Sequence, residues 1–149
     1  MTNELRPRDW LVLLLGIGDA RALDPIRIQK GMFLLAQEGA LRSEERYSFR
    51  AYDYGPFSSR IYSDLDDLVD EGYVIREAVP GYTWSRFRLS PTGLAEAHVL
   101  AARLSDRQRA SVRFLARLKR DVLSLSFNKL LRHVYDQYPD YAKNSVFSG

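Results

Sequence analysis

The pattern of apolar and polar residues is most informative around the middle of the first half of the chain. Apolar side chains at every second position over 47–51 predict a half-buried strand. Gly55 and Pro56 then predict a turn, because proline lacks an amide donor and glycine tolerates turn dihedrals. A helix is expected from Ser58, which can cap its first amides, to Gly72, which tolerates the left-handed backbone at a helix end. The apolar stripe of this helix consists of Ile61, Leu65, Leu68 and Val69.

Two helices are predicted ahead of this region. The first covers residues 8–15, an apolar run that stops at the glycines after it. The second begins at Asp24 and Pro25, a pair typical of a helix start, and continues to Gly39. Its apolar residues occupy most faces, which indicates a central, buried helix. We expect Lys30 in this helix to lie at the core edge with its ammonium in water.

A β-hairpin is predicted after the helix that ends at Gly72. Residues 73–78 and 83–89 form its strands, and Pro80-Gly81 fits the centre of a type II turn. Strand side chains alternate between two faces, so Phe87 and Leu89 point together to the core. The opposite face of the second strand then exposes Trp84, Arg86 and Arg88.

Three more helices are predicted in the second half of the chain. Ser90 and Pro91 begin one that runs to about residue 104, and a capping box at 105–108 opens another that runs to about residue 125. A last helix ends at Pro139. The tail has no periodicity, and we expect partial disorder at its end.

The order of these elements predicts an α+β, mainly helical fold. It is a winged helix-turn-helix with a β-hairpin wing and two extra C-terminal helices. We expect a single domain over 1–149, in which 1–93 form the helical core and wing, 94–139 the C-terminal helices and 140–149 the tail.

Composition excludes several kinds of chemistry. The 149 residues include no cysteine and two histidines, which excludes disulfides and thiol catalysis and argues against a metal site. No phosphate-binding loop or zinc motif is present, and helical spacing spreads the acids of 64–71 around their helix. We therefore expect no enzyme, no cofactor and no metal. The apolar run 11–15 is too short to cross a bilayer, so the cytoplasm is the expected compartment.

The molecule is expected to carry an acidic patch and a basic patch, although the net charge is only +3. Residues 64–77 contain six acids and one base, whereas 103–120 contain seven bases and one acid. Helical spacing places four of these bases in one stripe: Arg109, Arg113, Arg117 and Arg120. A solvated helix face is the first interpretation of this stripe, a partner or dimer contact the second, and a phosphate contact the third.

Several motifs resemble those of the YwgA-like winged-helix family. They are Ile28-Gln29-Lys30 before Phe33-Leu34-Leu35, then Tyr52-Asp53-Tyr54-Gly55-Pro56-Phe57-Ser58, then Asp64-Leu65, Leu68 and Gly72, and finally Tyr135-Asp136-Gln137-Tyr138-Pro139 with Tyr141 and Ser145. The Gln-Lys helix and the Tyr-Gly-Pro turn more loosely resemble Panacea-type antitoxin domains, which bind proteins. Residues 87–93 resemble the junction between wing and helix in many bacterial regulators. The resemblance implies a winged-helix fold.

The first functional hypothesis is a transcriptional regulator that binds double-stranded DNA. We expect it to be a homodimer that is held together by its C-terminal helices. The start of the Ser58 helix would enter the major groove, and the wing would contact phosphates or the minor groove. The candidate DNA-binding residues are Ser58, Ser59, Arg60, Tyr62, Ser63, Trp84, Arg86 and Arg88. Asp66, Asp67 and Asp70 oppose this hypothesis, because carboxylates are repelled by phosphates. An exposed strand edge blunted by arginines explains Arg86 and Arg88 equally well.

The alternative hypothesis is a protein-interaction module without catalysis, such as an antitoxin or an adaptor. The acidic helix face and exposed aromatic residues such as Tyr82 and Trp84 favour it, because a winged helix does not by itself fix a function.

Overall fold

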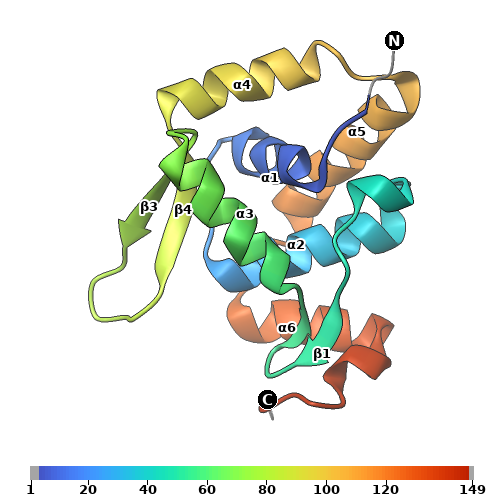
Figure 1. The fold of residues 1–149 in the computed structure, drawn as a ribbon. Helices are drawn as coiled ribbons and strands as arrows, with labels where there is room; N and C mark the ends of the chain where they lie inside the picture. The colour runs from blue at the N-terminus through green and yellow to red at the C-terminus, as the bar shows by residue number, and fades with distance from the viewer. Residues whose placement is uncertain (1–3, 148–149) are drawn as a thin grey trace.

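The computed structural model describes residues 4–147 and confirms the predicted fold class (Figure 1). The chain is α+β and mainly helical, with a two-stranded antiparallel wing and helices after it. Over the described residues the elements follow in the order α1 (Pro7–Gly16), α2 (Pro25–Glu38), η1 (Ser43–Glu45), β1 (Arg50–Tyr52), β2 (Gly55–Phe57), α3 (Ser59–Asp70), β3 (Val74–Ala78), β4 (Ser85–Leu89), α4 (Pro91–Ala101), α5 (Asp106–Asp121), α6 (Phe127–Gln137) and η2 (Pro139–Ala142).

The wing is the hairpin of β3 and β4, and its register pairs Val74 with Leu89 and Ala78 with Ser85. Leu23 extends this sheet, because its amide and carbonyl both bond Phe87 at 2.8 Å. In Figure 1 the N-terminus of α3 and the loop of the wing point to the same, lower side of the molecule. The hairpin of β1 and β2 lies on that side as well, next to the start of α3.

The hydrophobic core surrounds α1 and α2. In α1 the side chains of residues 10–15 are at most 5% exposed, so this helix is buried on almost every face. In α2 the run from Ile28 to Leu35 is buried too, as predicted for a central helix. Phe87 and Leu89 of the wing reach this core, which confirms the predicted facing of β4.

Most predicted helix ends have the expected hydrogen bonds. The Asp24 carboxylate accepts from the Arg27 amide at 2.9 Å, and Ser105 and Gln108 form the predicted capping box. The Tyr73 amide closes the end of α3 on the Leu68 carbonyl at 2.9 Å. In the wing, Gly81 has φ +83° within the predicted turn. Local sequence chemistry therefore determines where these elements begin and end.

Two details around α3 differ from the predictions. Gly55 and Pro56 do not form the turn but belong to β2, and the turn lies two residues earlier at Asp53 and Tyr54. Ser58 is the N-cap residue, yet its side chain accepts no bond from the amides of α3. The backbone of Ser58 has another partner, described below, that determines where the helix starts.

The C-terminal region also differs from its prediction. The helix expected to run to about residue 125 ends at Asp121. The expected tail is held through residue 147, because the Val146 amide donates to the Asp53 carbonyl at 2.8 Å and the Tyr135 hydroxyl bonds Ser145 at 2.6 Å. The disorder expected at the very end concerns 148–149, which lie outside the described residues.

Two buried charged side chains tie α5 to the N-terminal half. Glu45 accepts from the Trp10 indole at 3.1 Å and forms an ion pair with Arg107 at 2.7 Å. The Lys119 ammonium donates to the carbonyls of Leu14 and Ile17, both at 2.8 Å. These carbonyls belong to the end of α1, where no amide of the helix can reach them.

Residues 4–147 contain no helix that is both long enough and apolar enough to cross a membrane.

Replacing Lys119 with Met is expected to lower the free energy of unfolding by about 2 kcal/mol or more, because buried carbonyls at the end of α1 lose their donor. Arg117→Met on the exposed face of α5 is the matched control and should change stability by less than about 0.5 kcal/mol. Urea denaturation followed by circular dichroism measures both. An unchanged midpoint for Lys119→Met would contradict this role.

The wild-type protein and Lys119→Met should also differ in how their free energy of unfolding depends on pH. Burial lowers the pKa of Lys119 from 10.5 to about 8, so the unfolded chain binds more protons than the folded chain between these two pH values. The wild-type protein therefore gains stability as pH rises through this window. Lys119→Met should lack that part of the gain.

Candidate functional site

The start of α3 is fixed by a side chain of α2. The amide of Gln29 donates from Nε2 to the Ser58 carbonyl at 2.9 Å, and Gln29 Oε1 accepts from the Ser58 backbone amide at 2.8 Å. Both residues are buried, so this pair satisfies two backbone groups that water does not reach. Gln29 thereby holds the junction between β2 and α3 against the central helix.

The next residue of α2 brings a positive charge to the same junction. Lys30 is only 3% exposed, and its ammonium donates to the Pro56 carbonyl at 3.2 Å. No carboxylate within the described chain lies within 4 Å of this ammonium. Burial lowers the pKa of Lys30 to about 8. The expectation that its ammonium would lie in water is therefore wrong.

Gly55 makes the close approach of these segments possible. Its φ is +93°, and a Cβ at this position would lie 2.8 Å from Cε1 of Tyr135 and 3.6 Å from Cε of Lys30. Only glycine combines that backbone conformation with that space. The glycine of the Tyr-Gly-Pro motif thus allows β2 to pack closely against α2 and α6.

A pocket of about 150 Å³ opens beside this junction, and Gln29 and Lys30 contribute to its lining. Three aromatic rings from β1, β2 and α3 also line it and are called the aromatic wall: Tyr52, Phe57 and Tyr62. Their centroids are 4.8 Å apart for the first pair and 5.7 Å for the second. Tyr54 lines the pocket from the turn, and the three tyrosines are between 39% and 41% exposed.

The predicted DNA-binding residues of α3 are therefore not equivalent. Ser58 is only 5% exposed and its backbone is bound to Gln29, although it contributes to the hollow at the start of α3, so its contact with DNA stays a prediction. Ser59, Arg60 and Ser63 are exposed, and Tyr62 belongs to the aromatic wall. The Arg60 guanidinium lies 3.8 Å from Asp64 and over the ring of Tyr47.

The wing exposes its predicted residues, but with internal partners. Nε of Arg88 lies 3.2 Å from Glu77 of β3, and Nε of Arg86 lies 3.9 Å from the same carboxylate. Trp84 and Tyr82 are exposed and pack on each other with ring centroids 5.0 Å apart. The wing therefore exposes the Tyr82–Trp84 pair near its loop, whereas Arg86 and Arg88 share the negative charge of Glu77.

The acids of α3 are partly balanced within the protein. Asp64 accepts from the Tyr47 hydroxyl at 2.6 Å, and Asp66 pairs with Arg76 of β3. Glu71, just after the helix, binds Arg8 through both of its oxygens at 2.9 Å. Asp67 and Asp70 remain exposed toward the C-terminal end of α3. The repulsion of phosphate expected from this face is reduced, but it is not removed.

Sequence reasoning missed two arginines near the start of α3. Arg46 and Arg50 join Arg60 and Ser59 around an open hollow of about 350 Å³. Arg50 also covers the aromatic wall, with its guanidinium carbon 4.6 Å from the ring centre of Tyr52. The strand alternation places Arg50 opposite the buried side chains, so exposure could have been inferred. The proximity of these arginines to α3 could not, because it depends on the β1–β2 hairpin.

The stripe on α5 is exposed as expected. Arg109 pairs with Asp106, and Arg120 with Asp121 at 2.8 Å. Arg113 and Arg117 are exposed and have no carboxylate within 4 Å in the described chain. The expected contact of this stripe with a partner or a second copy stays a prediction.

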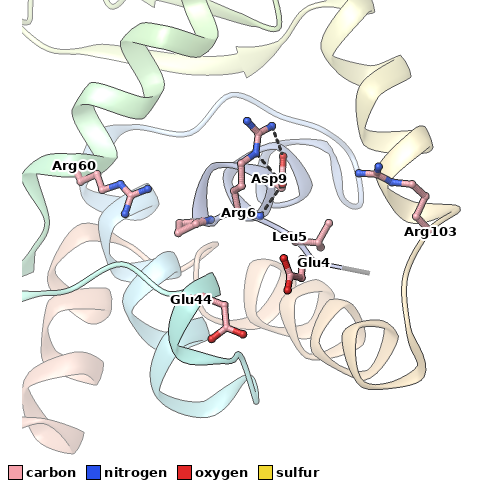
Figure 2. Close-up of a pocket in the computed structure, with 8 residues that line it drawn as sticks. Glu4, Leu5, Arg6, Asp9, Glu44, Arg60 and Arg103 are labelled. Carbon is pink, nitrogen blue, oxygen red and sulfur yellow. Dashed lines mark hydrogen bonds and ion pairs between the residues drawn. The ribbon is translucent and has the colours of Figure 1, made fainter. Parts of the chain in front are cut away.

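A wider pocket of about 540 Å³ lies between the N-terminal segment, α1 and η1 (Figure 2). Arg6 points to Asp9 there and binds it at 3.2 Å, while Arg60 and Arg103 enter from opposite sides. Glu4 and Glu44 add negative charge. Since its charges are mixed and Arg6 is already paired, this pocket has no clear ligand preference.

We expect Gln29→Leu to loosen the start of α3, because the Ser58 amide and carbonyl would lose their buried partner at a cost of about 2–4 kcal/mol. Hydrogen exchange at the Ser58 amide, measured by NMR, should accelerate by a factor on the order of 10² or more. Gln37→Leu, an exposed position on the same helix, should leave that exchange unchanged. Equal exchange in both variants would contradict the role given to Gln29.

The part of the chain that the structure describes contains no group of three His, Cys, Asp or Glu side chains arranged to hold a metal. Comparison with protein-family models and with curated proteins returned no match for this chain. The resemblance to the YwgA-like family therefore stays a prediction, and function has to be argued from the site itself.

Proposed function

We propose that the chain is a protein-interaction module, such as an antitoxin or an adaptor, that binds its partner through the surface around the start of α3 and the wing. The observation that carries this proposal is the clustering of exposed aromatic side chains. Tyr52, Tyr54 and Tyr62 surround one pocket, and Tyr82 and Trp84 lie on the wing. Figure 1 places the start of α3 and the wing loop on the same side of the molecule.

Aromatic residues and arginine are enriched where proteins bind proteins, since they combine large apolar area with a polar group. The surface here has that composition, with Arg50 stacked on the aromatic wall and Arg60 beside it. Exposed aromatic clusters are rare on surfaces that contact only water. The cluster therefore supports a partner-binding role.

The charges of α3 support the same proposal. The exposed face of this helix carries Asp66, Asp67 and Asp70, and Arg60 is its single basic residue. A helix that reads the major groove has to approach two rows of phosphates. An acidic recognition helix is better suited to a protein surface.

Alanine substitution of Tyr62 and of Trp84 tests this proposal. Partners captured by the immobilised protein from cells that make it are first identified by mass spectrometry, and their affinities are then measured by calorimetry. Each substitution should lower the affinity for a genuine partner by about tenfold or more, because an aromatic anchor of the interface is lost. Val99→Ala, an exposed apolar position on α4, is the control and should not change affinity. A set of captured proteins that bind all variants equally would refute the proposal.

A second proposal is that the chain is a regulator that binds double-stranded DNA by the start of α3. The specific observation in its favour is the group Arg46, Arg50 and Arg60 around the exposed Ser59. Helix N-termini and arginines both attract phosphate. The acids lie farther along α3, so contact by its first turn alone would avoid them.

This second proposal predicts that the protein binds random duplex DNA. The logarithm of the binding constant, measured by fluorescence anisotropy, should fall linearly with the logarithm of the salt concentration. Arg60→Ala should reduce the slope by about 1, because one phosphate contact is lost. Arg117→Ala on α5 is the control. Absence of binding at low salt would exclude DNA as the ligand.

A further inference from the structure

Lys30 is a charged group whose burial the contacts described above do not explain. It is 3% exposed, it lacks a carboxylate within 4 Å, and its one hydrogen bond goes to the Pro56 carbonyl at 3.2 Å. An ammonium has three donors, so the Pro56 bond leaves unused hydrogen-bonding capacity. Lys119, the comparable buried lysine, instead reaches three carbonyls at the end of α1.

The pocket beside Lys30 has the size of a site for a single side chain. Its volume is about 150 Å³, whereas pockets for whole small molecules range from roughly 300 to 1,000 Å³. The aromatic wall lines it together with Gln29 and Lys30 of α2, of which Lys30 brings a positive charge. A pocket with this lining favours a group that is apolar along its stem and negative at its end.

We propose that this pocket receives a glutamate side chain of the protein partner, with its methylene groups against the aromatic wall and its carboxylate next to the Lys30 ammonium. The inference rests on the proposed protein-binding function and names the chemistry of the partner: an acidic segment. A buried cation without a carboxylate in contact is costly, and a carboxylate from the partner would supply that contact, which Asp24 does not make.

The charges around the pocket agree with an acidic segment. Arg50 lies over Tyr52 and Phe57 at 4.6 and 5.6 Å from their ring centres, so it adds positive charge at the edge of the aromatic wall. Asp53 also lines the pocket, but it is exposed in the turn and therefore screened by water. Asp24 at the start of α2 is bound to Arg27 at 2.6 Å.

Two matched peptides test the inference on the intact protein. Acetyl-Ala-Glu-Ala-amide is titrated in parallel with the same peptide containing glutamine, and chemical shifts are followed at the amides of Gln29, Gly55 and Tyr62. We expect the glutamate peptide to bind at millimolar concentrations, at least about tenfold more tightly than the glutamine peptide. Lys30→Met should remove the difference between the two peptides.

The pH dependence provides a measurement that needs no variant. Burial lowers the pKa of Lys30 to about 8, so the cation that attracts the carboxylate is lost as pH rises through that value. Between pH 7 and pH 9 the affinity of the glutamate peptide should fall about tenfold. The other titratable groups that line the pocket are Asp53 and the phenols of Tyr52, Tyr54 and Tyr62. Asp24 acts on Lys30 through its charge, and the Tyr135 ring lies against Gly55. In Lys30→Met any remaining binding should not show this fall.

Equal binding of the two peptides, or the same shifts with inorganic phosphate alone, would overturn the inference. The capture experiment with Tyr62→Ala and Trp84→Ala would still decide the protein-binding function, since it does not depend on which side chain enters the pocket. A glutamate preference that survives in Lys30→Met would overturn the assignment to Lys30.

Discussion

The candidate site depends on the two hydrogen bonds between the Gln29 side chain and the Ser58 backbone. It joins the middle of the buried helix α2 to the residue at which β2 ends and α3 begins. Because a backbone amide and a backbone carbonyl are both satisfied, the junction has one favourable position instead of several. That position determines where α3 begins and holds the end of β2 next to α2, where the pocket opens.

Lys30 and Gly55 complete this arrangement at the neighbouring positions. The absence of a side chain on Gly55 lets β2 approach α2 and Tyr135, and the Lys30 ammonium then reaches the Pro56 carbonyl. Several residues of the motifs named in the sequence thus meet in space: Gln29, Lys30, Gly55, Pro56, Ser58 and Tyr135. Their shared role is to build the surface at the start of α3, with a buried cation beside aromatic rings that face outward.

The position of this surface accounts for the competing proposals about function. A winged helix presents the start of α3 and the wing on one side, whatever the ligand is. On this side the protein exposes tyrosines, a tryptophan and arginines, while the acids of α3 lie toward its other end. Aromatic rings with a buried ammonium favour a protein ligand with negative charge. The arginines at the start of α3 are what a nucleic acid would use.

The sequence by itself determined the order and nature of the elements. Asp24-Pro25, Ser90-Pro91 and the Ser105–Gln108 capping box act within a few residues of themselves, so their outcome does not depend on the rest of the chain. The alternation predicted over residues 83–89 likewise indicated that Phe87 and Leu89 reach the core and that Trp84 is exposed. Pattern and capping chemistry were sufficient for the fold class for this reason.

Only the tertiary structure decided which side chains meet at the candidate site. Ser58 looked like an exposed cap, but a glutamine 29 residues away occupies its backbone. Lys30 looked like a residue at the core edge, but β2 covers it. Arg46 and Arg50 reach the start of α3 through a hairpin whose turn lies at Asp53 and Tyr54, not at Gly55 and Pro56. Contacts between segments far apart in the chain depend on packing, and local propensity carries no information about them.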